Sequence, residues 1–397
     1  MKKLIIVGGG YSALVLGGAL LENNFKDFLI LERNDRVGKK ILVTGNGRCN
    51  LTNDRLDLSF YHGGRTDFIE YALKKYDNAS VERFFARRGL LLTRENGRVY
   101  PLSRVSASVL DALRLPLADY VVTGAFVKDI KKTGDCFLLK TADGQTYKTE
   151  NVVLSCGGKS GQNLGTDGSS YRLAETLGHT ITKLYPSLTF VLSSTFPKGL
   201  KGIKHFASVT LVDGDKPVKN SVGDFLITEK GVSGNSVFDL SSEISSTKKP
   251  LFSVDFLPEY KFALVVDALK NKRGFYPDVA AKNMLTGYVH SAFSEHVALR
   301  LGIHDMPLSS VDDNTIKSAV ELVKNYPVKI DGVGGFEFSQ VTHGGVDTRA
   351  VNKKTMESKL CRGLYFTGEI LDVDGDCGGY NLQWAYSSAM VVSESFK

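Results

Sequence analysis

The chain of 397 residues has few of the residues that mark disulfide scaffolds, fibres or disordered proteins. It contains only 10 prolines and only 5 cysteines, an odd number without a C-x-x-C pair. Such cysteines favour reduced thiols in a cytoplasm over a disulfide framework, and they give no zinc spacing. Apolar residues at 42% and charged residues at 23% are ordinary for a globular fold. The length then suggests about two to three units with cores of their own.

Long apolar runs are absent as well. The start, MKKLIIVGGG, is too short in apolar residues for a signal peptide, and no run approaches the ~18 residues of a membrane span. We therefore expect a cytoplasmic protein without membrane association. The net charge of +7 is spread along the chain, so we do not expect nucleic acid as a partner. The sequence does not indicate an oligomeric state.

Glycine, by contrast, is in excess. There are 40 glycines, where a usual content of ~7% would give about 28. At the start of the chain the pattern predicts a strand over residues 4–7, a turn at Gly8-Gly9-Gly10, a helix up to residue 21 and a second strand over residues 28–31. Nearly continuous apolar strands of this kind are typical of a parallel sheet covered on both faces.

The turn between this strand and helix fits the dinucleotide-binding pattern G-x-G-x-x-G/A. Gly8 allows the tight turn, Gly10 leaves bare backbone for a pyrophosphate, and Ala13 is small enough for close packing of helix and strand. Glu32 closes the second strand, where a carboxylate can accept hydrogen bonds from the adenosine ribose. A 2′-phosphate would face this negative charge, which argues against it. At this point NAD and FAD both remain open.

Two later segments favour FAD. The run GLYFTGE (363–369) reads as a strand that ends in a glycine and an acid, Gly368 and Glu369, an arrangement suited to a ribityl chain. Gly378 and Gly379 then begin the last helix. The N-terminus of a helix is a suitable partner for the negative charge of a reduced flavin.

Candidate catalytic groups are few. Arg48, His343 and Tyr380 are polar residues in segments expected near the flavin. The other six histidines are expected to be surface or core residues, and Cys49 a structural thiol. The run DVDGDCGGYNLQ resembles a calcium loop, but it lacks the required glycine and final glutamate, so no metal is expected.

The pattern changes along the middle of the chain. Residues 190–254 alternate as in antiparallel strands, residues 259–324 have helical periodicity, and the last sixty residues return to the glycine-rich style. Helices are also expected over 67–88 and 104–115, and a hairpin over 120–132 and 136–141. We predict an α/β fold: a Rossmann-like FAD domain of the two-dinucleotide-binding type (1–188 and 340–397), interrupted by an antiparallel β-barrel-like unit (189–257) and a helical unit (258–339).

With these motifs in place, the chain resembles the BaiN/YhiN-like family of bacterial flavoproteins, which includes aminoacetone-oxidase-like and bile-acid-reductase-like members. The resemblance covers nearly the whole length. It rests on GKKILVTGNGRCNLTN, GTDGSSYRLAETLGH, VTHGGVDTRAVNKKTMESKL and GLYFTGEILDVDGDCGGYNLQWAYSSA. It implies FAD as cofactor in a three-domain flavoprotein.

The resemblance also implies a set of cofactor-binding residues, which follow the order of the FAD molecule. They are Gly8, Gly10, Ser12, Ala13, Glu32 and Arg33 for the ADP half, Val127, Cys156 and Gly157 near the adenine, Lys40 and Thr44 along the pyrophosphate and flavin, Gly368 and Glu369 for the ribityl chain, and Gly379, Tyr380 and Asn381 for the flavin pyrimidine.

Three functions remain after this reading. The leading hypothesis is an FAD-dependent oxidoreductase that uses NAD(P)H to reduce an activated C=C bond in a hydrophobic small molecule. The first alternative is a flavin-dependent amine or amino-ketone oxidase that uses oxygen. The second is a flavin-bound RNA-interacting or redox-sensing protein, which the basic balance permits.

Overall fold

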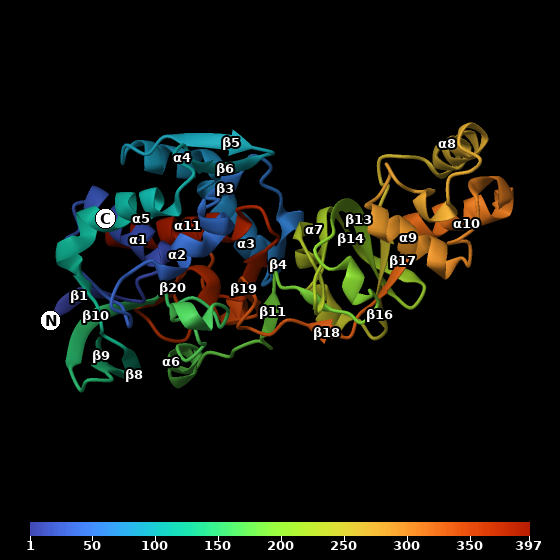
Figure 1. Ribbon diagram of the computed structural model, residues 1–397. Helices are drawn as coiled ribbons and strands as arrows, with labels where there is room; N and C mark the ends of the chain where they lie inside the picture. Colours follow the sequence, from blue (N-terminus) through green and yellow to red (C-terminus); the bar gives the residue numbers. More distant parts are fainter. The chain divides into compact units, whose positions relative to one another are not determined.

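The computed structural model describes residues 1–397 and divides the chain into two units. The first unit comprises Met1–Pro186 and Phe336–Lys397, so the two ends of the chain, blue and red in Figure 1, belong to the same unit. The second unit comprises Ser187–Gly335. The sequence places the corresponding boundaries after residues 188 and 339.

The first unit is built on a seven-stranded sheet. Its strands are β1 (Lys2–Val7), β2 (Phe28–Leu31), β7 (Val121–Val122), β8 (Val127–Thr133), β9 (Cys136–Thr141), β10 (Thr146–Leu154) and β20 (Leu364–Phe366). The order is β7-β2-β1-β10-β9-β8, and β20 also pairs with β10. Strand β10 has two kinds of neighbour: its first half is antiparallel to β9 and its second half is parallel to β1 and β20.

Seven helices belong to this unit: α1 (Tyr11–Glu22), α2 (Lys39–Val43), α3 (Thr66–Lys75), α4 (Asn78–Ala86), α5 (Ser106–Arg114), α6 (Tyr171–Thr176) and α11 (Tyr380–Ser393). Helix α1 is buried over most of its length and packs against α11, the last helix of the chain. The apolar run after the glycine turn thus forms a core helix, and β1, α1 and β2 form the Rossmann-like unit that the sequence predicts.

Three small sheets complete the first unit. One consists of β3 (Thr52–Asn53), β6 (Arg98–Pro101) and β5 (Leu92–Glu95), in this order. The other two are pairs: β4 (Tyr61–Gly63) with β21 (Val373–Gly375), and β11 (Tyr185–Ser187) with β19 (Val341–His343). Segments far apart in the sequence meet in each of these pairs.

The second unit contains an antiparallel sheet of seven strands with helices. The strands, in sheet order, are β17 (Tyr326–Lys329), β16 (Pro250–Asp255), β13 (Lys204–Asp213), β14 (Lys216–Ile227), β15 (Gly231–Ser233), β12 (Val191–Leu192) and β18 (Gly332–Val333), and the helices are α7 (Asn235–Phe238), α8 (Phe262–Phe275), α9 (Ser291–Arg300) and α10 (Asp313–Lys324). β17 and β18 follow the helices in the sequence but complete the sheet. The division of this region at residue 257 stays a proposal.

Two local predictions need correction. The helix expected over 67–88 is two helices, α3 and α4, because the Asp77 side chain accepts a hydrogen bond from the Ser80 amide and caps a new helix. The hairpin expected over 120–141 is β8 and β9 alone, since Val121–Val122 lies at the other edge of the sheet, parallel to β2. Short apolar strands of similar composition cannot be assigned to a sheet edge by pattern alone.

Candidate functional site

The turn between β1 and α1 leaves the start of the helix open. Gly8 has a φ of +101°, and a Cβ there would lie 2.6 Å from the Ser155 carbonyl oxygen, so only glycine fits. Gly10 precedes the helix, no side chain caps it, and a Cβ at Gly10 would meet no atom within 4 Å. Uncapped amide groups beside open space are what an anionic phosphate requires.

Glu32 lies beside this turn, buried at the end of β2. Its carboxylate accepts a hydrogen bond from the Gly9 amide at 2.6 Å and two from Asn34, from the backbone amide and the side chain, each at 2.7 Å. These donors fix the carboxylate at the edge of the glycine turn. Ser12 and Ala13 lie in the first turn of α1 and are buried. Arg33, the next residue along the chain, is held by Asp167 at 2.8 Å.

The segment after β10 comes up against the same turn. A Cβ at Gly8 would lie 2.9 Å from the Cys156 Cα atom, and the Cys156 thiol donates to the Val7 carbonyl oxygen at 3.2 Å. Burial raises the pKa of this thiol to about 12, which keeps it neutral. Gly157 has a φ of +72°. Val127 is buried at the start of β8.

A second group of predicted residues forms around Glu369. Its carboxylate forms an ion pair with Lys40 at 2.7 Å and accepts a hydrogen bond from the Thr342 amide at 3.0 Å. The preceding Gly368 has a φ of +72°, and a Cβ there would crowd Ser12. Thr44 is less available for a ligand, because its hydroxyl donates to the Ile41 carbonyl oxygen.

The start of α11 is the second open helix terminus. Gly379 precedes the helix with a φ of +102°, and no side chain caps it. A Cβ there would lie 2.6 Å from the Thr52 carbonyl oxygen and 2.9 Å from Oδ1 of Asn50, a buried oxygen without a hydrogen-bond partner. Asn381 folds back and pairs with both the amide and the carbonyl of Gly375. An orphaned acceptor beside a helix start that no side chain caps fits a heterocycle that carries both an N–H group and carbonyl oxygens.

The three candidate catalytic side chains differ in their surroundings. The Tyr380 ring is buried and stacks on Phe60 with 4.6 Å between ring centroids, so it serves packing. Arg48 lies over the Tyr100 ring and forms a half-exposed ion pair with Glu95 at 3.3 Å. His343 ends β19 one residue after Thr342, the partner of Glu369.

His62 is one residue that sequence reasoning missed. It was expected to be a surface or core histidine, but its Nε2 atom lies 2.6 Å from Asp376, while Nδ1 of His343 lies 2.7 Å from Asp374. Asp372 lies close by, and burial raises the pKa of its carboxyl, an effect that His343 opposes. The available signal was the alternation of aspartates at 372, 374 and 376, which a strand places on one face.

Cys49 lies in the core, as expected for a structural thiol. It has no exposed surface, and burial raises its pKa to about 12. A thiol that stays protonated is a poor nucleophile.

None of the helices of the chain is both long and apolar enough to span a membrane.

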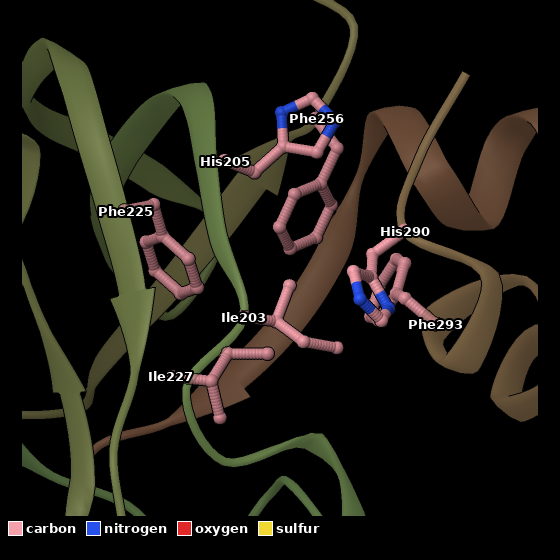
Figure 2. A pocket seen from close by; sticks show the side chains of 7 residues that line it. All are labelled: Ile203, His205, Phe225, Ile227, Phe256, His290 and Phe293. Carbon is pink, nitrogen blue, oxygen red and sulfur yellow. The ribbon is translucent and has the colours of Figure 1, made fainter. Parts of the chain in front are cut away.

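The second unit has an apolar hollow between its sheet and helix α9. Figure 2 shows the phenyl rings and aliphatic side chains that surround it, with His205 and His290 at its margin; the lining residues are Ile203, His205, Phe225, Ile227, Phe256, His290 and Phe293. Its walls approach so closely that a water molecule does not fit inside. It is therefore a packing gap of the core and not a preformed ligand site.

The arrangement of the first unit defines a class of protein. Two open helix N-termini, the fixed carboxylates of Glu32 and Glu369, and the orphaned Asn50 oxygen fit FAD, with its pyrophosphate and its flavin each at a helix start. The fold is that of an FAD-binding oxidoreductase.

The comparisons with known proteins give the family. Residues 2–395 match the model described as HI0933-like protein Rossmann domain, and the chain belongs to this family. A 3-dehydro-bile acid delta(4,6)-reductase of Clostridium scindens is 35% identical, and the alignment covers 100% of this chain and 99% of the relative. A ribosomal RNA dihydrouridine synthase of Haemophilus influenzae is 27% identical, with 98% and 97% covered. The resemblance inferred from the sequence is thereby confirmed.

Similarity to solved structures is more distant. The 3-ketosteroid delta1-dehydrogenase of Sterolibacterium denitrificans shares 12% identity at a TM-score of 0.49, with 100% of this chain and 99% of that chain covered. The family and its reductase member establish this protein as an FAD-dependent oxidoreductase.

Proposed function

We propose that the protein uses NAD(P)H to reduce a C=C bond conjugated to a carbonyl group in a hydrophobic small molecule. The observation that carries this proposal is the 35% identity to a bile acid delta(4,6)-reductase along the whole of both chains. We place the activity in the cytoplasm, where NAD(P)H is available, in agreement with five cysteines that form no disulfide.

The second relative points to the same bond type. A dihydrouridine synthase is named for a uracil whose C5–C6 double bond has been saturated, and that bond is conjugated to the C4 carbonyl. A bile acid and a uracil differ greatly in size and polarity. What the two names share is reduction of a C=C bond beside a carbonyl group, and this shared chemistry is the core of the proposal.

The residues of the first unit have definite parts in such a reaction. When bound, FAD would supply the hydride-transfer chemistry between NAD(P)H and the substrate. Glu32 and the start of α1 would hold the adenosine and pyrophosphate, and Lys40 with Glu369 would hold the ribityl region. The open start of α11 would stabilise negative charge at the flavin pyrimidine. The proposed cofactor residues are those predicted from the sequence, with Asn50 added.

An RNA uracil is the second candidate substrate. It is favoured by the dihydrouridine synthase relatives and by the charge of the first unit, which has 33 basic and 27 acidic side chains against 17 and 16 in the second. The excess of basic over acidic side chains is modest and is spread along the sequence. We therefore prefer a hydrophobic small molecule as the substrate.

Anaerobic mixing tests the proposal. NADH or NADPH should bleach the flavin absorbance, and the steroid enone 4-androstene-3,17-dione should restore it with formation of the saturated ketone. If neither nicotinamide bleaches the flavin while aminoacetone does, the protein is an amine oxidase and the proposal fails. If only a uridine-containing ribosomal RNA transcript restores the absorbance, the substrate is RNA and the bond type stands.

A further inference from the structure

The aspartates of the calcium-loop-like run, Asp372, Asp374 and Asp376, lie beside two histidines. Strand β21 pairs antiparallel with β4, and its Asp374 lies directly opposite His62. Asp374 is the central residue of β21, and Asp372 and Asp376 flank the strand at alternate positions. Two of these three carboxylates contact a histidine ring.

In the His343–Asp374 pair the carboxylate is fully buried, whereas the His343 side chain is 29% exposed. Asp374 has no exposed surface, one of its oxygens meets Nδ1 of His343 at 2.7 Å, and the other has no hydrogen-bond partner. A carboxylate held at Nδ1 fixes the orientation of the His343 ring, which suits it to a positioned hydrogen bond.

In the His62–Asp376 pair both side chains are partly buried. The His62 side chain is 16% exposed and that of Asp376 is 13% exposed, and their contact is 2.6 Å long. The charged and titratable groups around the two pairs are Asp372, whose carboxylate lies beside Gly63, and Lys183 with Tyr185 beside His343. An imidazole held by a carboxylate is a side chain of the type that serves as a general acid.

Both pairs adjoin the residues that fit the flavin. His343 follows Thr342, whose amide contacts Glu369, and Asp376 precedes Gly379 at the start of α11 by three residues. The Asp376 amide also donates to the Phe60 carbonyl oxygen, which ties β4 to this start. The His343 pair thus adjoins the segment around Glu369, and the His62 pair adjoins the start of α11.

We propose that His62 is the acid that protonates the substrate carbon, that Asp376 positions it, and that His343 donates a hydrogen bond to the substrate carbonyl oxygen. This inference rests on the proposed function. A hydride adds to the carbon β to the carbonyl, and the electron pair of the C=C bond takes the proton of His62 at the α carbon. NAD(P)H is oxidised to NAD(P)⁺, the C=C bond becomes a CH–CH unit, and water returns a proton to His62.

Ligand binding tests the two histidines without turnover. Ionised phenols stack on oxidised flavins with a long-wavelength charge-transfer absorption, and their oxygen imitates the carbonyl oxygen that gains negative charge. We expect p-chlorophenol to bind the wild-type holoenzyme and His343→Gln to weaken it about tenfold, the effect of one hydrogen bond to a charged group. His62→Gln should raise the pH at which the bound phenol ionises, within about pH 6 to 9.

The control is His304→Gln. His304 is also paired with carboxylates, Glu295 and Asp305, but it belongs to the second unit. This variant should bind the phenol as the wild type does. Absence of phenol binding by the wild type, or a His62→Gln holoenzyme with full flavin content and an unchanged phenol titration, would overturn the inference.

Half-reaction kinetics separate this inference from the proposed function. In His62→Gln, bleaching by NAD(P)H should keep its wild-type rate, whereas reoxidation by 4-androstene-3,17-dione should slow at least about 100-fold. Asp376→Asn, which keeps the imidazole, should slow reoxidation less and provides a second variant if His62→Gln loses flavin. Equal rates in all forms contradict the inference. A wild type that binds the phenol through His62 but reduces no enone contradicts the proposed function alone.

Discussion

The two units of the chain differ in the kind of side chain that they bury. The first unit buries charge: Glu32 and Asp374 have little or no exposed surface and are held by amides or a histidine. The second unit has an apolar core in which Phe256 contacts Phe225, Phe293 and Tyr326. Burial of a charge costs free energy unless hydrogen bonds or an ionic partner compensate it. Buried charged groups therefore occur mainly at functional sites. From this difference we propose that the catalytic groups lie in the first unit and that the second unit is a packed body.

The largest effect should come from reversing the buried charge of the first unit. Glu32→Arg removes the acceptor of the Gly9 amide and places a cation where the ribose is expected. We expect loss of nearly all bound FAD, at least about a 100-fold drop in affinity, measured by flavin absorbance after purification. Glu229→Arg, at an exposed ion pair of the second unit, is the control. A Glu32→Arg protein of full yellow colour would refute the ribose assignment.

The matching change in the second unit is Phe256→Ala. Loss of this buried ring should lower the free energy of unfolding by about 3–5 kcal/mol, measured by denaturant titration. The flavin spectrum of the first unit should be unaffected at temperatures where the variant is folded. Phe206→Ala, at a half-exposed ring, should cost less than about 0.5 kcal/mol. Loss of flavin in Phe256→Ala without unfolding would show that the units do not divide the work as proposed.

A smaller effect is expected from Gly379→Ala at the start of α11. The added Cβ would meet the Thr52 carbonyl oxygen in a backbone conformation with a φ of +102°. We expect a cost of about 1–3 kcal/mol in stability and weaker flavin binding, by thermal unfolding and flavin fluorescence. Gly302→Ala in the second unit, with a φ of +69° and no atom within 4 Å of the Cβ, separates backbone strain from the clash.

The smallest effect concerns pH. Burial lowers the pKa of His179 in the first unit below its ordinary value, since one ring nitrogen has no partner and the ring packs on Phe366. The folded state therefore binds this proton less readily than the unfolded state. His179 allows full stability above about pH 6.5, and stability falls as the pH drops from there toward the lowered pKa. His179→Phe should flatten this part of a stability curve, and an unchanged curve would contradict the assignment.

Sequence reasoning reached the fold class and the cofactor because those depend on local patterns. The glycine turn from Gly8, the acid at Glu32 and the glycine start of α11 each lie within a short stretch of chain. It missed the break between α3 and α4, where one capping aspartate outweighs a continuous helical period. It also missed Asn50, whose orphaned oxygen is evident only beside Gly379.

The sequence by itself thus determined the Rossmann-like fold, the FAD cofactor and the family. Backbone turns and helix starts depend on residues that are neighbours in the chain, so they can be recognised without the tertiary structure. Only the tertiary structure decided which polar groups meet. His62 and Asp376 are 314 positions apart in the chain, and His343 and Asp374 are separated by 31. No periodicity links such pairs, since antiparallel pairing of β4 with β21 is a long-range choice that depends on packing of the whole unit.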